Sequence, residues 1–229
     1  MRVLSFDTST EWLTVAAGDG ARWCTHLERA GAANSERILP AVGTVLAEAG
    51  WRLVDLDGIA FGAGPGAFTG VRVACSVAQG IALGAELPVV AIPTLLALAQ
   101  EVWRDRAATR VFACLDARMR EVYAAFYVRH GEGWRIEREP AVLKPLDVSV
   151  PGDGWVGAGD GFLAYPSLAA LSGVARVHAD ALPTGRAIGE LALPLLASGQ
   201  GVAASEALPL YVRHRVALTA AERDAGARL

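Results

Sequence analysis

Two similar stretches of sequence decide the fold: Arg2-Val3-Leu4-Ser5-Phe6-Asp7-Thr8-Ser9-Thr10 and, half a chain later, Arg110-Val111-Phe112-Ala113-Cys114-Leu115-Asp116. Each is a short apolar run that ends in an aspartate, which is typical of a buried strand entering a polar turn. A second apolar strand follows each copy, at 13–17 and at 121–128. A strand–turn–strand unit that recurs in this way indicates two copies of one fold.

The first half has the pattern of a ribonuclease-H-like layer. Alternating or continuous apolar runs predict strands at 2–7, 13–17, 22–29, 58–62 and 88–92. Apolar spacings of three, four and seven predict a helix at 34–49, a run with many small residues predicts a second at 70–84, and a third is expected at 94–103. The order βββαβαβα predicts a mixed sheet with helices packed on it.

The second half is shorter and less regular. Its pattern predicts strands at 110–116, 121–128 and 134–142, a helix at 186–198 and a last strand or extended tail at 206–218. We therefore expect an α/β protein with two ribonuclease-H-like subdomains, the second of them degraded. The expected boundaries are 1–104 for the N-terminal subdomain and 105–229 for the C-terminal one with its tail.

Composition narrows the class of protein. The 229 residues are 53% hydrophobic and 20% charged, so a sizeable core can form. A net charge of −3 argues against a chain that coats nucleic acid by electrostatics alone. Three widely spaced cysteines without a CxxC indicate reduced thiols, as in a cytoplasmic protein. Glycines and prolines divide the apolar stretch 73–100, so we interpret it as buried core and not as a membrane span.

The turn Asp7-Thr8-Ser9-Thr10 is a candidate phosphate-binding turn. Two-lobed kinases and ATPases of the actin-like class grip phosphate at such a point, with a glycine two residues after the aspartate that lets backbone N–H groups approach. Ser9 takes that glycine's place here, and Arg118 takes it in the second copy, which begins at Asp116. The alternative interpretation is that Asp7 and Asp116 only accept hydrogen bonds from their own turns.

Other catalytic motifs are weak in this sequence. The glycine-rich segment 62–70 could hold an anion before a helix, but it is neither a P-loop nor a dinucleotide fingerprint. The four histidines form no metal motif, and no Gly-x-Ser-x-Gly elbow is present, which disfavours a metalloenzyme or a peptidase. The charged group Asp116, Arg118 and Glu121 is either catalytic or an ion-pair network at a turn.

The helices at 34–49 and 70–84 each carry an apolar or small-residue face. If both faces point outward, they form a flat apolar surface of the kind that binds a partner. If they point inward, they cover the protein's own sheet.

Four motifs in order carry a family resemblance: Ile38-Leu39-Pro40, Gly64-Pro65-Gly66-Ala67-Phe68-Thr69-Gly70-Val71-Arg72, Asp116-Ala117-Arg118-Met119 and Pro209-Leu210-Tyr211-Val212-Arg213. The chain resembles the bacterial tRNA threonylcarbamoyladenosine biosynthesis family TsaB, also called YeaZ, closely over residues 1–127. The resemblance implies a two-lobed actin-like (ASKHA) fold. It also implies a non-catalytic scaffold for TsaD, a related protein that transfers threonylcarbamoyl to the adenosine next to the tRNA anticodon.

The resemblance also implies partners and a binding face. The partners would be a TsaD-like paralogue, a TsaE-like ATPase and, through the same helices, a second copy of the chain. The chain would meet tRNA only indirectly, so Arg213, His214 and Arg215 are expected to be a solvated basic patch. The expected interface residues are Ser35, Ile38, Leu39, Val42, Leu46, Phe68, Val71, Arg72, Cys75 and Gln79.

Neither a metal site nor a cofactor of its own is expected. Asp7, Thr8, Ser9 and Thr10 would be a vestigial phosphate turn, and ATP with magnesium would enter only at the assembled complex. Asn34, Ala67 and Arg120 depart from the family's usual His, Ser and Gly, the first two of them at the expected interface. The alternative function is an actin-like ATPase or small-molecule kinase that uses Asp7 and Asp116.

Overall fold

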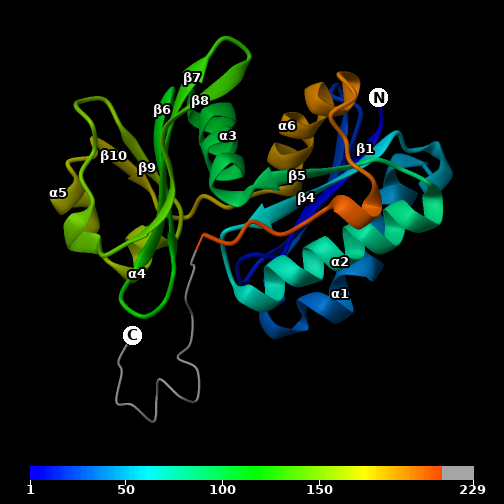
Figure 1. Cartoon of the computed structure of the whole chain (residues 1–229), viewed down its shortest axis with the longest axis horizontal. Helices are drawn as coiled ribbons and strands as arrows, with labels where there is room; N and C mark the ends of the chain where they lie inside the picture. Colours follow the sequence, from blue (N-terminus) through cyan, green and yellow to red (C-terminus); the bar gives the residue numbers. More distant parts are fainter. Residues whose placement is uncertain (213–229) are drawn as a thin grey trace.

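The computed structural model describes residues 1–212 as two lobes, each built around a five-stranded sheet (Figure 1). The first sheet has the strand order β3-β2-β1-β4-β5, from β1 (Val3–Asp7), β2 (Leu13–Gly18), β3 (Trp23–Glu28), β4 (Gly58–Gly64) and β5 (Val89–Pro93). The second has the order β10-β9-β6-β7-β8, from β6 (Arg110–Asp116), β7 (Val122–His130), β8 (Gly133–Leu143), β9 (Val156–Ala158) and β10 (Arg176–His178).

The helices follow the strands in both lobes. The α-helices are α1 (Asn34–Ala49), α2 (Phe68–Ala85), α3 (Thr94–Arg106), α4 (Gly161–Ala164), α5 (Leu168–Ser172) and α6 (Gly185–Ala197). Short 3-10 turns occupy Gly31–Ala33, Leu53–Asp55, Pro145–Asp147 and Ala204–Glu206. The helices expected at 34–49, 70–84, 94–103 and 186–198 are thus present with small shifts at their ends.

The internal repeat predicted from the sequence is confirmed by the strand pairing. In each lobe the first strand pairs antiparallel with the second and parallel with the fourth, and the outer pairs repeat the same directions. Asp7 and Asp116 end the two equivalent central strands, β1 and β6. The second lobe is the degraded copy, since β9 and β10 have three residues each and α4 and α5 only four and five.

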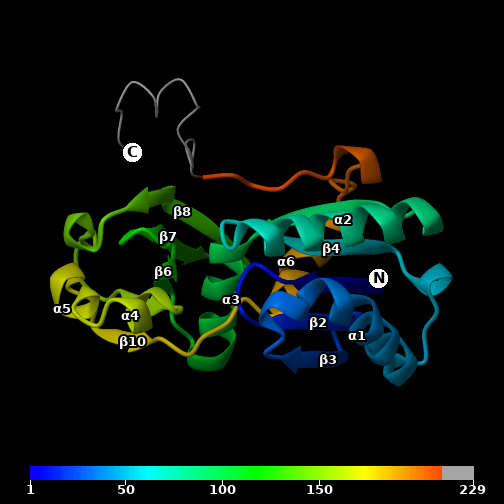
Figure 2. The same cartoon turned by 90° about the horizontal axis from the view of Figure 1, so that it is seen from below.

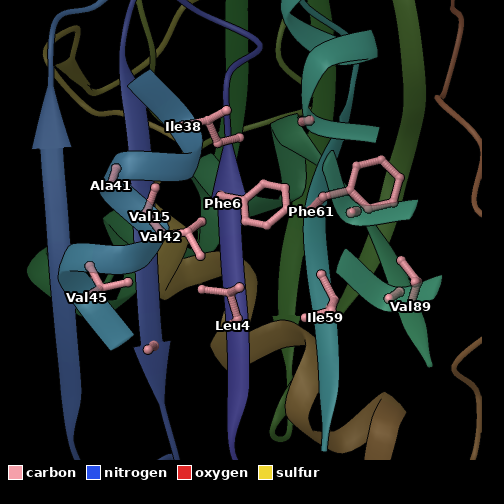
Figure 3. Close-up of a cluster of buried hydrophobic side chains, with 14 of the residues drawn as sticks. Leu4, Phe6, Val15, Ile38, Ala41, Val42, Val45, Ile59, Phe61 and Val89 are labelled. Atoms are coloured by element: carbon pink, nitrogen blue, oxygen red, sulfur yellow. The ribbon is translucent and has the colours of Figure 1, made fainter. Parts of the chain in front are cut away.

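Helices cover both faces of the first sheet. α1 and α2 lie side by side on one face (Figure 1), where Ile38, Val42 and Val45 of α1 belong to the same buried cluster as Phe6 of β1 and Phe61 of β4 (Figure 3). α6 covers the opposite face through residues such as Ala187, Ile188 and Ala192. Burial of these side chains on both faces explains why β1 and β4 are apolar at nearly every position.

α3 and α6 pack against each other between the lobes. In the sequence, α3 follows β5 of the first sheet, whereas α6 follows β10 of the second sheet. Gln100 of α3 donates a hydrogen bond to Glu190 of α6 at 2.9 Å and accepts one from Trp134 of β8 at 2.9 Å. The sequence-based boundary at 104/105 assigns α6 to the second subdomain, whereas its side chains pack on the first sheet. The chain therefore returns to the first lobe after β10.

After α6, residues 198–212 form a segment without strands or α-helix, interrupted by the 3-10 turn Ala204–Glu206, whose last part runs along α2; we call it the C-terminal strap (Figure 2). Gln79 donates to the Ala207 carbonyl at 2.8 Å, and the Leu210 N–H donates to the Ala63 carbonyl at 2.7 Å. A single antiparallel bridge, Val89 with Val202, joins the strap to the sheet. A strand was one alternative for 206–218; residues 206–212 contain none, and 213–218, with the basic patch Arg213, His214 and Arg215, lie outside the described residues.

We predict that Gly185→Ala weakens the docking of α6. A Cβ at Gly185 would lie 2.8 Å from the Ala16 nitrogen and 2.9 Å from the Ser5 carbonyl oxygen, both fixed backbone atoms. The substitution should lower the free energy of unfolding by about 1–3 kcal/mol in urea denaturation. Gly80→Ala is the matched control: nothing lies within 4 Å of its added methyl, so it should stabilise the chain by about 0.5–1 kcal/mol. Equal effects of the two substitutions would contradict the packing described for α6.

Candidate functional site: the cleft and the outer helix face

A cleft of about 1190 Å³ opens between the lobes. Its floor is formed by the turns that follow the two central strands, at 8–11 and 115–119. The loop 65–67 with the start of α2 and the end of the strap form its walls. This is the place where the sequence predicted a phosphate-binding turn in each copy.

Asp7 is buried, and both oxygens of its carboxylate accept hydrogen bonds from residues of the first lobe. Oδ1 accepts hydrogen bonds from the backbone N–H and the hydroxyl of Ser9, at 2.7 and 2.6 Å, and Oδ2 accepts one from Thr94 at 3.1 Å. Burial raises the pKa of Asp7 to about 6, against the lowering effect of those hydrogen bonds. Gly62 also closes over the carboxylate, since a Cβ there would lie 1.7 Å from Oδ2. These contacts match the interpretation that Asp7 serves its own turn.

The glycine-rich loop packs directly on that turn. A Cβ at Gly70 would lie 1.8 Å from the Thr8 carbonyl oxygen, and one at Gly66 would lie 2.5 Å from the Ser9 carbonyl oxygen. The Thr8 hydroxyl donates to the Gly70 carbonyl at 2.7 Å, and the Ala67 N–H donates to the Ser9 carbonyl at 2.7 Å. The glycines are therefore required for close backbone contact, and the Ala67 N–H is already committed to the protein.

Asn34, at the start of α1, also contacts this turn. The Asn34 side-chain amide lies 3.4 Å from the carbonyl oxygens of Thr8 and Thr10, so the first residue of α1 is tied to the cleft floor. The start of α1 and the start of α2 thus both depend on the turn after β1.

In the turn after β6 of the second lobe, the aspartate forms an ion pair, unlike Asp7 in the first lobe. Asp116 pairs with Arg118 at 3.1 Å and accepts a hydrogen bond from the Arg118 N–H at 2.9 Å, so the cluster predicted there includes an ion pair at a turn. Asp160, which the sequence did not single out, accepts from the Asp116 N–H at 2.9 Å. Burial raises the pKa of Asp160, and the neighbouring carboxylate of Asp116 raises it further. Arg118, Met119 and Arg120 all have positive φ, a strained backbone for residues other than glycine.

The apolar faces of α1 and α2 point inward, so half of the predicted interface residues belong to the core. Five of the ten are buried under the helices: Ile38, Val42, Leu46, Val71 and Cys75. Four others are largely exposed, namely Ser35, Leu39 (58%), Phe68 (53%) and Arg72. Gln79 is half-buried and holds the strap. The reason is geometric: helical apolar periodicity identifies the side that faces the sheet.

The opposite side of the two helices is a surface that we call the outer helix face. It consists of two rows of exposed residues spaced by four: Ser35, Leu39, Gly43 and Ala47 in α1, and Phe68, Arg72, Ser76, Gly80 and Gly84 in α2. Residues four apart lie on one side of a helix. Small residues predominate here, and nothing in the described part of the chain lies within 4 Å of a Cβ added at Gly43, Gly80 or Gly84.

Two further features bear on the kind of site. Within residues 1–212, no group of three or more His, Cys, Asp or Glu could hold a metal ion. α2 is the single helix in that range that is long and apolar enough to span a bilayer, with a mean hydropathy of 1.3. Length and composition are weak evidence for a span, and Ala74, Ala78 and Ala82 of this helix are buried against the first sheet.

The two five-stranded sheets of equal topology and the cleft between them define a two-lobed protein of the actin-like class. A family model described as "TsaD: tRNA N6-adenosine threonylcarbamoyltransferase" matches residues 28–213. The chain is 42% identical to the tRNA threonylcarbamoyladenosine biosynthesis protein TsaB of Escherichia coli (strain K12), over 95% of this chain and 96% of that protein. It is 37% identical to the TsaB of Haemophilus influenzae, over 94% and 95% of the two chains.

Solved structures agree with these relatives. YeaZ from Pseudomonas aeruginosa is 41% identical, with a TM-score of 0.85 over 92% of this chain and 99% of that one. A second structure from that organism, described as an uncharacterized protein with similarity to peptidase YEAZ, gives a TM-score of 0.86 at 41% identity, over 93% and 99%. The chain belongs to the TsaB (YeaZ) family.

Leu39→Asp and Val42→Asp are a matched pair that separates surface from core. Val42 is 5% exposed and packs under α1, so an aspartate there should cost several kcal/mol of folding free energy. At Leu39 the same carboxylate stays in water and should change stability by about 0.5 kcal/mol or less. Denaturant unfolding of both variants measures the difference. Similar losses in the two would mean that Leu39 is not on the outside.

The stability of the chain should depend on pH through Asp7. Because burial raises its pKa from 3.8 to about 6, the native state binds a proton more tightly than the unfolded chain. Stability due to Asp7 should therefore fall as pH rises from about 4 to 6, by at most about 3 kcal/mol. Asp7→Asn can keep the bonds from Ser9 and should abolish this step. Unfolding of both proteins at pH 4.5 and pH 7 tests the prediction, and a constant difference between them would contradict it.

Proposed function

We propose that this chain acts in the biosynthesis of threonylcarbamoyladenosine in tRNA as a non-catalytic subunit. In this proposal it binds a TsaD-like protein through the outer helix face. A TsaE-like ATPase joins the assembly, in the cytoplasm, where tRNA is modified. The chain contacts tRNA only through its partners, and ATP with magnesium binds only where the assembled proteins meet.

The glycines of the outer helix face carry the proposal. Gly43, Gly80 and Gly84 lie inside helices, where each costs about 0.5–1 kcal/mol relative to alanine. Nothing in the described chain occupies the space where their Cβ atoms would be, so no internal contact accounts for them. The close approach of a partner's helices would account for all three, because small residues let helix backbones come together. Leu39 and Phe68 add exposed apolar area to the same face.

The occupied carboxylate of Asp7 supports a role without catalysis. A kinase or ATPase of the actin-like class needs an ionised aspartate that can reach magnesium and phosphate. Asp7 is buried, bonded to Ser9 and Thr94, and covered by Gly62. The size of the cleft and the carboxylates of Asp116 and Asp160 favour the ATPase or kinase alternative, so that alternative needs a direct test.

Reconstituted transfer is the test of the proposed role. The assay contains the cognate TsaD-like protein, the ATPase partner, tRNA and the threonylcarbamoyl adenylate, with and without this chain. We expect modification to require the chain, to be lost with Leu39→Asp and to persist with Asp7→Asn. Full modification without the chain would reject the role. Tight ATP binding by the isolated chain in calorimetry, lost in Asp7→Asn, would favour the enzyme alternative.

Gly80→Leu separates binding from stability. A leucine at this exposed helix position should stabilise the monomer by about 0.5–1 kcal/mol, because it replaces a helix glycine. The same side chain should block a closely packed partner and raise the Kd at least about tenfold. Calorimetric titration with the TsaD-like protein measures the Kd, with Gly80→Ala as the smaller step. Unchanged affinity in Gly80→Leu would place the partner elsewhere.

A further inference from the structure

Phe68, Arg72 and Tyr211 form a stack where α2 begins and the strap crosses it. The guanidinium carbon of Arg72 lies 3.4 Å from the centre of the Phe68 ring and 5.5 Å from that of Tyr211. Arg72 Nε donates to the Tyr211 hydroxyl at 2.8 Å, and the two ring centres are 6.2 Å apart. The guanidinium thus lies against two aromatic rings, and a hydrogen bond to Tyr211 sets its position.

Two anchors of the strap hold Tyr211 in this place. The N–H of Leu210, the residue before Tyr211, donates to the Ala63 carbonyl, and Gln79 donates to the Ala207 carbonyl. Ala207 itself is buried against the core that includes Cys75. The stack is therefore prepared before any partner arrives, which reduces the side-chain entropy lost on binding.

Within residues 1–212, Arg72 has N–H donors without a partner and no Asp or Glu that pairs with it. An arginine has five N–H donors, and only the one on Nε has a partner among residues 1–212. The ion pairs among residues 1–212 join His26 or arginines other than Arg72 to Asp or Glu. Phe68 and Tyr211 are 53% and 48% exposed, so the stack is open to an incoming group.

We propose that this stack is the charged anchor of the partner interface, and that it receives a carboxylate from an Asp or Glu of the TsaD-like protein. The inference rests on the proposed function and adds the chemistry of the contact. The planar fork of the two Nη atoms matches a carboxylate in bidentate geometry. The aromatic and apolar surroundings suit a packed protein face, and arginine and tyrosine in such settings are common sources of binding energy.

The anchor is tested by binding of full-length variants to the TsaD-like protein without tRNA. Arg72→Ala should raise the Kd at least about tenfold and reduce its dependence on salt. Arg72→Lys should recover little, because lysine keeps the charge but loses the fork and the stack. Tyr211→Phe keeps the ring and should have a smaller effect. Arg176→Ala, which removes an exposed arginine from the second lobe, is the matched control and should bind normally.

Charge exchange distinguishes a direct contact from a structural role. Arg72→Glu should abolish binding. Replacing one exposed Asp or Glu of the TsaD-like protein with arginine should then restore binding to the Arg72→Glu variant. The proposal is overturned if Arg72→Ala binds with wild-type affinity. It is also overturned if Arg72→Glu alters only self-association of this chain, or only binding of tRNA.

Failure of this inference is distinguishable from failure of the proposed function. If Leu39→Asp prevents binding while the Arg72 variants bind normally, the outer helix face stands and the anchor does not. If the wild-type chain fails to bind the TsaD-like protein, the proposed function itself fails. Thermal unfolding of Arg72→Ala should match that of the wild type within a few degrees, since the strap keeps its other anchors.

Discussion

The contact between the glycine-rich loop and the turn after β1 is the constraint on which the rest of the structure depends. Gly66 and Gly70 allow the loop backbone to touch the carbonyl groups of Thr8 and Ser9, and no larger residue fits there without displacement. Thr94 extends the contact, since it donates to Asp7 and accepts from the Gly64 N–H at 3.1 Å. These contacts fix where α2 begins and hence which of its sides faces outward.

The same contact occupies polar groups of the candidate phosphate-binding turn after β1. The N–H groups of Ser9 and Ala67 are bonded within the turn and the loop, and the Asp7 carboxylate accepts hydrogen bonds from Ser9 and Thr94. The cleft keeps its volume, but its first lobe offers a closed floor. In our proposal, the binding surface lies on the outer side of α1 and α2 and at the strap. In our account, binding to partners there has replaced chemistry in the cleft.

Much of the fold could be predicted from the sequence, because strong local patterns decide it. The repeated apolar strands that end in Asp7 and Asp116 indicated two equivalent lobes, and apolar periodicity placed the long helices. β9 and β10 could not be predicted because three residues are too few for a periodicity. The position of α6 depends on contacts such as Gly185 with the Ser5 carbonyl, which are set by tertiary packing alone.

The site was harder to predict than the fold. Apolar periodicity marks the buried side of a helix, so Val42 and Cys75 were assigned to an interface although they belong to the core. The informative residues were the glycines on the exposed side of these helices, Gly43, Gly80 and Gly84. No contact within the described chain requires a glycine at these positions. Asp160 was missed because it meets Asp116 only through the parallel pairing of β9 with β6. Tyr211 meets Arg72 only because the strap returns to α2.

Hydrogen exchange of the full chain, with and without the TsaD-like protein, tests the central claim most directly. The account predicts that binding slows exchange in residues 35–47 and 68–84 and in the strap near Tyr211. It also predicts that ATP alone leaves the cleft turns at 7–11 and 116–121 unchanged. The opposite pattern, with ATP protecting the cleft turns and the partner leaving α1 and α2 unaffected, would contradict it.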